Sequence, residues 1–529
     1  MTSVQCQVQT RQGHLIFDTV NSLLQHWPNT RYRNGHNIIP GTVPAGTLLY
    51  HGRPDSNIPT VPDWTATDPE HAYPFCGLPA DNATITGCWQ LTFAVMRPLK
   101  VLYFDGSSAA NMEEGGTMDA QDLLAWEHVD PMRWAYDRER LEALCAWGSQ
   151  FGIDGYVRME EDFEVMLCDF TAGVELLSAE LLAALWDTSR FRNPGARAAL
   201  RSTAYHNSPS SPIWTNNSGA APGLGVSELI NFESVRAGSW HNRYPGETRI
   251  VLDLSRLISF YDTDLVPSLI PYRASLERWD HRVHNISAPD LRALTTRLRA
   301  VLSDPAASDP GSGIDWKTLY RVVVDRYAER LELLDYLLNT TDATNATARG
   351  ETLQAQLRII LTPYTLQNAQ PTSANDSDAW AAPVWRGCTT RHTAHIHTSS
   401  VLRARLTASE RLLLRALDET SREICRVVVR MWIAGVRAGL DPLIPLPKTT
   451  TADPRKISHV VEGWRSDART LMAWLDWSVW IKCRPACGEM CYLPTWPFFY
   501  FRPDRDKDEH VWKRPQPRCI RMFEPYSQL

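Results

Sequence analysis

The sequence predicts an α+β protein with more than one domain. Its 529 residues exceed what a single core of ordinary size organises. Short runs of β-branched and aromatic residues alternate with helical patterns up to residue 189, whereas amphipathic helical patterns dominate the later part. The hydrophobic fraction of 43% and the 20 tryptophans are typical of a folded chain.

The expected elements follow from these periodicities. Strands are predicted at 46–51, 88–96, 99–104 and 250–260, and as a pair across 155–169. Helices are predicted at 119–126, 137–151, 178–186, 290–302, 316–338, 352–360, 400–438 and 458–481.

Composition then divides the chain. An N-terminal mixed α/β domain, expected to be catalytic, is predicted at 1–189, and a linker rich in Ser, Asn, Pro and Gly at 190–225. A second α/β segment is expected at 226–340, a low-complexity linker at 341–379, and a basic, mainly helical region with a Cys-rich end at 380–529.

Charge is distributed unevenly along the chain, although the net charge is only −6. From Trp380 onward there are 24 Lys+Arg against 15 Asp+Glu, which leaves 30 against 45 in the preceding residues. One interpretation is a basic surface for a polyanion joined to an acidic part that handles a cation. The other is a basic segment that docks on the protein's own acidic body.

The eleven cysteines are odd in number and scattered, which favours reduced thiols. No apolar signal or membrane-span pattern is found, so a cytoplasmic protein without membrane contact is expected. The six Asn-x-Ser/Thr sequons would then stay unmodified. A zinc site is a weaker hypothesis for the four cysteines at the end of the chain, Cys483, Cys487, Cys491 and Cys519.

The most informative motif is a crowd of carboxylates between two predicted strands, formed by Glu160, Glu161, Asp162 and Glu164, with Asp169 shortly after. Like charges repel, and each carboxylate removed from water loses solvation. Such a cluster either faces solvent or receives a cation. A guanidinium group suits it because bidentate hydrogen bonds select the planar fork.

Three further groups of residues are candidates for binding or proton transfer. His51 and Gly52 end a strand, and Trp64 lies in the next one. Tyr103 and Asp105 lead into a Gly-Ser-Ser turn with Ser107, and this turn is also consistent with an ordinary helix cap. His241 and Glu247 lie on a turn-rich loop, which is consistent with either a binding loop or a plain polar one.

Arginines form a stripe on the long helix predicted at 400–438. They recur at helical spacing along one side, at Arg411, Arg415, Arg422, Arg426 and Arg430. Such a stripe suits the phosphates of a tRNA acceptor stem, which provide affinity without sequence readout.

Two family resemblances add to this interpretation. Tyr50-His-Gly52 and the stretch Trp64-Thr-Ala-x-Asp-Pro-Glu-His71 resemble the nucleotide site of ADP-ribosyltransferases. That resemblance implies NAD held at His51 and Gly52, with Glu164 as the nearest candidate for the catalytic glutamate.

More of the chain resembles fungal arginine-containing cyclodipeptide synthases. The matching stretches are Tyr50-His-Gly52, Trp64 to His71, Val101 to Ala110, Met118-Asp-x-Gln-Asp122, Arg158 to Phe170 and Trp240-His-x-x-Tyr-Pro-Gly-Glu247. That family has an Asp-Asp-x-x-Glu motif, to which Glu160-Glu161-x-x-Glu164 is the closest approximation here. The resemblance implies that arginine from arginyl-tRNA is condensed with a second aminoacyl group into a cyclic dipeptide.

The leading hypothesis is therefore a tRNA-dependent cyclodipeptide synthase with no cofactor, whose partners are two aminoacyl-tRNAs. The residues expected to act catalytically are Glu160, Glu161, Glu164, His51, Tyr103 and Asp105. Those expected to bind substrate are Asp162, Asp169, Trp64, Ser107, His241 and Glu247. The alternatives are an ADP-ribosyltransferase-like enzyme and a non-catalytic RNA-binding protein, and the sequence does not specify the second amino acid or the oligomeric state.

Overall fold

The computed structural model describes residues 12–76, 87–112, 115–159, 161–184, 233, 235–303, 311–340, 345–367, 369–371, 377–444, 454–487, 490–493 and 514–520. The chain forms two compact units, and each is built from two stretches that are separated in the sequence. A sheet unit comprises Ser22–Asp309 and Ile481–Leu529, and a helical unit comprises Met1–Asn21 and Pro310–Trp480. The mixed α+β class is therefore confirmed, whereas the domain boundaries differ from those expected.

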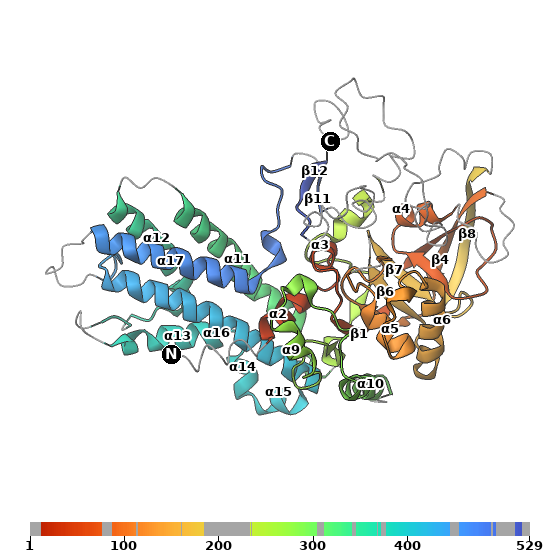
Figure 1. The fold of residues 1–529 in the computed structure, drawn as a ribbon, viewed down its shortest axis with the longest axis horizontal. Coiled ribbons are helices and arrows are strands. Elements are labelled where there is room, and N and C mark those ends of the chain that lie inside the picture. The colour runs from red at the N-terminus through yellow and green to blue at the C-terminus, as the bar shows by residue number, and fades with distance from the viewer. Residues whose placement is uncertain are drawn as a thin grey trace, which may run out of the picture. The chain divides into compact units, whose positions relative to one another are not determined.

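The sheet unit is built on a ten-stranded sheet with the strand order β10-β1-β5-β6-β7-β3-β2-β4-β8, in which β9 also pairs with β1 (Figure 1). The strands are β1 (Asn37–Val43), β2 (Leu48–Arg53), β3 (Asp63–Ala66), β4 (Gly87–Val95), β5 (Leu99–Phe104), β6 (Gly155–Met159), β7 (Phe163–Leu167), β8 (Val174–Ala184), β9 (Val251–Leu252) and β10 (Ile258–Ser259). A separate ribbon pairs β11 (Met490–Tyr492) with β12 (Arg518–Ile520).

One strand pair explains how helices come to cover the sheet. β5 and β6 are parallel, and two parallel strands need a long crossover connection. The connection forms α5 (Asp119–Trp126) and α6 (Asp137–Gly148), both close to their predicted positions. Their apolar residues, including Leu123 and Leu141, pack with Tyr156 and Met166 of the sheet and with α10 (Ala288–Ser303) in one buried core.

Shorter helices lie around this sheet. They are α3 (His26–Arg31), α4 (Pro69–Ala72) and α9 (Leu269–Arg273). Of these, α4 begins at the Asp-Pro-Glu-His stretch that follows β3, so it places Asp68 and His71 close to the end of that strand.

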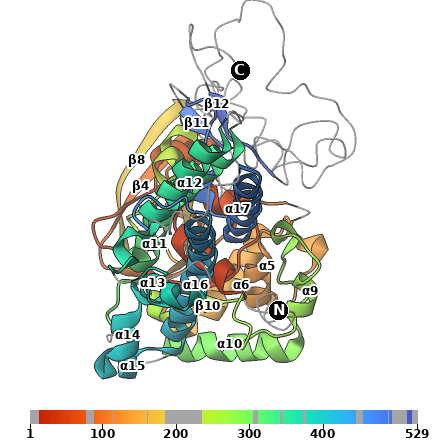
Figure 2. The same ribbon diagram turned by 90° about the vertical axis from the view of Figure 1, so that its left-hand side faces the viewer.

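The helical unit consists mainly of long amphipathic helices that run alongside one another, as Figures 1 and 2 show. They are α11 (Trp316–Asn339), α12 (Ala346–Leu361), α13 (Ala382–Thr390), α14 (Ala394–Thr398), α15 (Ser400–Arg405), α16 (Ala408–Arg437) and α17 (Pro454–Leu475). At the start of the described chain, α2 (Gly13–Ser22) places Phe17 against Tyr320 and Trp477. Among the described helices, none has the length and apolar character needed to cross a membrane.

Three sequence predictions of secondary structure are wrong for identifiable reasons. Residues 178–184 of the helix expected at 178–186 lie in β8, where pairing along the whole of β4 overrides the helical preference of Leu, Ala and Glu. The strand expected at 250–260 is interrupted because the Asp253 carboxylate accepts a hydrogen bond from the Ser255 amide and starts a 3-10 turn. The helix expected at 400–438 is two helices, because Thr407 and Glu410 form a capping box that begins α16.

The expectation of reduced thiols is also wrong in this structure. Five disulfides join Cys76 to Cys88, Cys145 to Cys168, Cys388 to Cys425, Cys483 to Cys491, and Cys487 to Cys519. They use ten of the eleven cysteines. The last two pairs include all four proposed zinc ligands, and a sulfur in a disulfide is not the thiolate that zinc binds.

These pairs predict a thiol count. Under denaturing but non-reducing conditions, an alkylating reagent is expected to modify at most one cysteine per chain, Cys6, and to modify eleven after reduction. Mass spectrometry of the alkylated protein gives the two numbers, and a Cys6→Ser variant serves as the control with an expected value of zero before reduction. Ten or eleven reactive thiols without reductant would contradict the disulfide pairing.

Candidate functional site

The acidic hairpin predicted from the sequence exists, and most of its described carboxylates are buried. β6 and β7 are antiparallel neighbours, with Arg158 directly opposite Glu164. The side chain of Asp162 has no exposed surface, while those of Glu161 and Glu164 are 11% and 6% exposed. Glu160 lies outside the described residues. The carboxylates are thus removed from water, and something must compensate for their lost solvation.

One compensating group is Arg158, whose guanidinium joins the hairpin to α6. Its Nε donates to Glu164 at 2.8 Å, and its two terminal nitrogens donate to both oxygens of Asp137, each at 2.8 Å. Asp137 also accepts from Arg140, which in turn donates to Asp122 at 2.6 Å. Although burial opposes ionisation, the charge of Arg158 lowers the pKa of both Glu164 and Asp137, the latter to about 2.

His71 of α4 is the second compensating group. Its Nε2 lies 3.7 Å from Glu164 and its Nδ1 4.0 Å from Glu161. Burial favours the neutral imidazole, but the nearby carboxylates of Glu164, Asp162 and Glu161 raise the pKa of His71 to about 9. His71 is therefore a cation at neutral pH and contributes to the charge balance of the hairpin.

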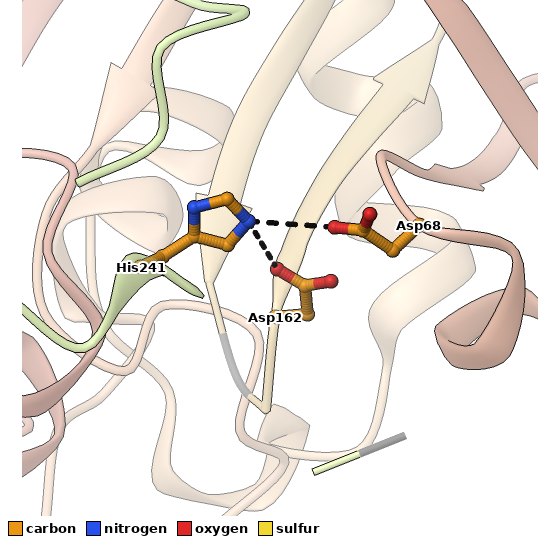
Figure 3. A group of neighbouring side chains, drawn as sticks. All are labelled: Asp68, Asp162 and His241. Atoms are coloured by element: carbon orange, nitrogen blue, oxygen red, sulfur yellow. Dashed lines mark hydrogen bonds and ion pairs between the residues drawn. The ribbon is translucent and has the colours of Figure 1, made fainter. Parts of the chain in front are cut away.

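A second cluster of side chains surrounds His241, which lies on the 3-10 turn Gly238–His241 (Figure 3). Its Nε2 lies 3.4 Å from Asp68, 3.6 Å from Asp162 and 3.2 Å from Glu247. Gly238 permits this approach, since a Cβ there would lie 2.4 Å from the Glu161 carbonyl oxygen. These residues come from three separate segments of the chain.

Arg249 completes this second cluster. Its Nε and Nη2 donate to the two oxygens of Glu247 at 2.9 and 2.7 Å. Its Nη1 and Nη2 donate to the two oxygens of Asp68 at 3.2 and 2.7 Å, and Nη1 also donates to the Thr67 carbonyl at 2.6 Å. These three acceptors, which we call the guanidinium clasp (Thr67 carbonyl, Asp68 and Glu247), therefore match all five N–H donors of a guanidinium group.

Asp162 links the two clusters. Its Oδ1 accepts from the Phe163 amide at 2.7 Å, whereas Oδ2 is buried and accepts no hydrogen bond from the described residues. Burial and the charge of Asp68 raise the pKa of Asp162 above its ordinary value, while the charge of His241 opposes that rise. Burial also lowers the pKa of His241, but the hydrogen bond to Asp68 and the charge of Asp162 outweigh burial and raise this pKa above its ordinary value. The pair Asp162–His241 can therefore hold or transfer a proton.

A metal ion is a geometric possibility at the same place. Asp68, Asp162 and His241 each offer one ligand atom, and these atoms lie within 4.8 Å of one another. However, the guanidinium group of Arg249 already bonds to Asp68 and to the neighbouring Glu247. A metal ion would have to displace this arginine, so the cation that the cluster needs is already supplied by the chain.

The structure separates His51 from the acidic cluster. Tyr50, Ala66 and Glu164 are direct partners across β2, β3 and β7 and so share one face of the sheet. His51 therefore lies on the opposite face. There its Nδ1 donates to the Trp64 carbonyl at 2.6 Å, and its Nε2 lies 3.9 Å from Asp63. The three strands proposed for an NAD site are neighbours, but His51 and Glu164 do not converge.

Other proposed residues lie apart from both clusters. The hydroxyl of Tyr103 accepts from the Leu24 amide, and Asp105 is buried, where it accepts from the amides of His36 and Asn37. Ser107 is buried, and its amide donates to the Arg33 carbonyl. These contacts hold the chain between α3 and β1 in place, which is a structural role.

Trp64 and Asp169 also have contacts of their own. The ring of Trp64 lies under the guanidinium groups of Arg138 and Arg158, at 5.2 and 5.8 Å, so it packs beside the hairpin cluster. Asp169 is exposed, bonds to Thr171, and borders an open depression of about 450 Å³ that Arg97 and Lys100 also line.

The arginine stripe is exposed on α16, as predicted. Arg426 donates to Glu423, and Arg430 donates to Asp467 of α17 at 2.6 Å. Two of the five charges are thus partly neutralised on the protein surface. Arg411 donates to the Leu406 carbonyl, and all five side chains of the stripe are exposed.

Sequence reasoning missed five charged residues of the clusters, four of which lie near a quoted motif. Asp68 and His71 belong to the stretch after Trp64, and Arg249 follows the loop with His241. Arg158 was indicated by the hairpin itself, because antiparallel pairing around a short loop places it opposite Glu164. No local signal identifies Asp137, whose contact with Arg158 depends on the packing of α6.

This chain is similar to known proteins whose names state no activity. A model of the YPL277C N-terminal domain matches residues 79–189. Two proteins of Saccharomyces cerevisiae are similar over longer stretches, the uncharacterized proteins YOR389W and YPL277C. The first is 24% identical over 91% of this chain and 81% of its own length, and the second is 26% identical over 63% of this chain and 78% of its own length. No solved structure matches the chain.

The buried ion pairs predict a strong contrast between two arginines. Arg158→Met is expected to destabilise the protein by about 3–5 kcal/mol, because Glu164 and Asp137 would both lose the buried guanidinium group that bonds to them and would keep only His71 and Arg140 as nearby cations. Arg97→Met is the matched control, since Arg97 is half exposed on its bidentate bond to Asp154 and should lose about 1 kcal/mol or less. Urea unfolding gives both values, and equal losses would contradict the proposed role of Arg158.

His71 predicts a pH dependence of stability. Its pKa in the folded protein, about 9, lies above the ordinary value of 6.5, so its contribution is full below pH 6.5 and is lost as the pH rises through 9. The expected loss is of the order of 3 kcal/mol. Unfolding free energies measured from pH 6 to 10 should decline for the wild type and decline less for His71→Gln. An equal decline in both proteins would show that His71 is not the titrating group.

Proposed function

We propose that this chain is an enzyme that binds a guanidinium-bearing substrate at the guanidinium clasp and moves a proton through His241 and Asp162. The observation that carries the proposal is the complete match between the clasp and the five donors of a guanidinium group. Lysine, a point charge without a planar fork, does not reproduce this pattern.

The clasp has an exposed side through which a substrate can enter. The side chain of Arg249 is 33% exposed and that of Asp68 is 18% exposed, whereas those of Glu247 and Asp162 are fully buried. Arg249 therefore occupies the solvent-facing edge in the way a substrate's guanidinium group would. When Arg249 turns outward, an incoming guanidinium group recovers the same five hydrogen bonds.

The polar atoms next to the clasp support chemistry as well as binding. Asp162 Oδ2 and His241 Nδ1 are buried and form no hydrogen bond with the described residues. His241 Nε2 touches both acids of the clasp, so a bound arginine places its neighbouring groups beside a proton donor and acceptor. We assign His241 and Asp162 the proton transfer, and Asp68 and Glu247 the orientation of the substrate.

The specific reaction we propose is formation of an arginine-containing cyclic dipeptide from two aminoacyl-tRNAs. The amine of one aminoacyl group attacks the ester carbon of the other, an amine proton passes to a base, and the tRNA hydroxyl leaves with a proton. A second, intramolecular attack closes the ring and releases the other tRNA. The exposed arginines of α16 favour this version, because they offer phosphate contacts.

The specific reaction depends on the cellular compartment of the protein, whereas the general proposal does not. Aminoacyl-tRNA requires the cytoplasm, which the sequence predicts for this chain, whereas five disulfides are typical of an oxidising compartment. Recognition of a guanidinium group does not depend on this choice. The general and the specific proposals are therefore tested separately.

The general proposal predicts selective binding of arginine amide. Calorimetric titration of the wild type is expected to show arginine amide bound at least tenfold more tightly than lysine amide. Asp68→Asn should weaken arginine binding about tenfold or more, because one bidentate acceptor is lost. Asp130→Asn is the control, since Asp130 is a partly exposed carboxylate that caps the 3-10 turn at 131–133. No preference for arginine, or equal binding by both variants, would refute the proposal.

The specific reaction predicts a product in cells. Extracts of a heterologous host that expresses the full chain should contain a diketopiperazine mass with arginine, and Asp162→Asn should abolish it while the protein remains folded. The amide of asparagine keeps an acceptor for the Phe163 amide but removes the proton-carrying group. Arginine binding without such a product would support the clasp and exclude this reaction.

A further inference from the structure

The paired cysteines give the first indication of where the chain folds. Cys145 of α6 is bonded to Cys168 beyond β7 within the sheet unit. Cys388 of α13 is bonded to Cys425 of α16 within the helical unit, so each unit has its own disulfide. Cys388 and Cys425 are 1% and 0% exposed. Such pairs form and persist in oxidising compartments, whereas glutathione and thioredoxin keep cytosolic thiols reduced.

Acceptor sequons for N-linked glycans give a second, independent indication. The asparagines of three sequons, Asn285-Ile-Ser, Asn339-Thr-Thr and Asn345-Ala-Thr, lie in the described residues, and all three are exposed. Those at Asn82, Asn216 and Asn375 lie outside the described residues. A glycan requires a solvent-facing asparagine in the finished fold, and the three described positions meet this condition.

The side-chain hydrogen bonds distinguish the three positions. Asn345 caps α12 through Oδ1, which accepts from the Ala348 amide, and this leaves Nδ2 for a sugar. Asn285 is exposed in the loop before α10. Asn339 differs, because its Nδ2 donates to the Asp335 carbonyl at 2.7 Å and to the Asp335 carboxylate at 3.0 Å. A glycan on Asn339 would replace one Nδ2 hydrogen and so remove one of these two hydrogen bonds.

We propose that this chain folds in an oxidising secretory compartment and carries N-linked glycans on Asn285 and Asn345. In the modification, the Nδ2 nitrogen of asparagine attacks C1 of an oligosaccharide bound to a lipid diphosphate. The C1–O bond breaks, the N–C bond forms, an amide proton is released and the lipid diphosphate leaves. The donor and its transferase belong to the secretory compartment.

The inference stands independently of the guanidinium clasp and bears on its substrate. Aminoacyl-tRNA is absent from that compartment, so this inference and the tRNA-dependent reaction proposed above are alternatives that exclude each other. The guanidinium clasp is compatible with either, and in the secretory case its substrate is a free metabolite, a peptide or a protein side chain. The clasp itself lies on the sheet unit around Asp68 and Glu247, and neither Asn285 nor Asn345 belongs to it. Failure of one proposal therefore leaves the other testable.

Site occupancy tests the proposal directly. The full chain is expressed in yeast, and N-glycans are removed enzymatically in heavy-oxygen water, which marks each formerly glycosylated asparagine as labelled aspartate. We expect labelled peptides for residues 285 and 345, and a mobility shift that decreases by one step in Asn285→Gln and by one step in Asn345→Gln. Asn339→Gln, and Asn57→Gln at an exposed asparagine without a sequon, serve as matched controls with no change.

The outcomes divide clearly. Label at both positions supports the proposal, and label at one position alone overturns the assignment of the other. Absence of label at both, in protein that is folded by circular dichroism, overturns the inference. A fully reduced set of cysteines in the same preparation overturns the assigned compartment.

Discussion

The sheet unit depends on one constraint, which is that buried carboxylates must find cations within the same chain. Asp137, Glu164, Asp162 and Glu247 are largely removed from water, and an isolated buried carboxylate costs several kcal/mol. Arg158 joins the hairpin to α6. Arg249 joins Asp68, which follows β3, to Glu247 in the loop with His241. Each guanidinium group bonds to two carboxylates at once, so removing either arginine takes a charged hydrogen-bond partner from two acids. The geometry of the hairpin, α6 and the loop with His241 is therefore fixed together.

The same constraint connects structure to the proposed chemistry. Binding a substrate guanidinium group in this cluster requires that one of the protein's own cations can leave. Arg249 is the cation with a partly exposed side chain. Asp162 and His241 lie between this replaceable cation and the permanently buried pairs. In the proposed function, the cluster exchanges a guanidinium group at its edge while Arg158 and His71 balance the charge of its interior.

Local sequence patterns predicted much of the sheet but little of the site. β5 and the hairpin of β6 and β7 were predicted because β-branched and aromatic residues fill short runs. β8 was not, because its Leu, Ala and Glu residues favour a helix and only the distant β4 makes it a strand. In the site, Asp162, Glu164, His241 and Glu247 were identified from the motifs. The hydrogen bond between His241 and Asp68 joins residues that lie 173 positions apart in the sequence, and local sequence patterns do not predict contacts over such a distance. Cysteine pairing was missed for the same reason, since sequence spacing does not reveal which sulfurs approach each other.

The most direct test of the central claim is a crystal structure of the protein with arginine amide bound. The account predicts a guanidinium group bonded to Asp68 and Glu247 with its remaining atoms next to His241, and the side chain of Arg249 turned into solvent. Arg249 unchanged in its place, with the ligand bound elsewhere or not at all, would show that these acids serve only to hold the fold together.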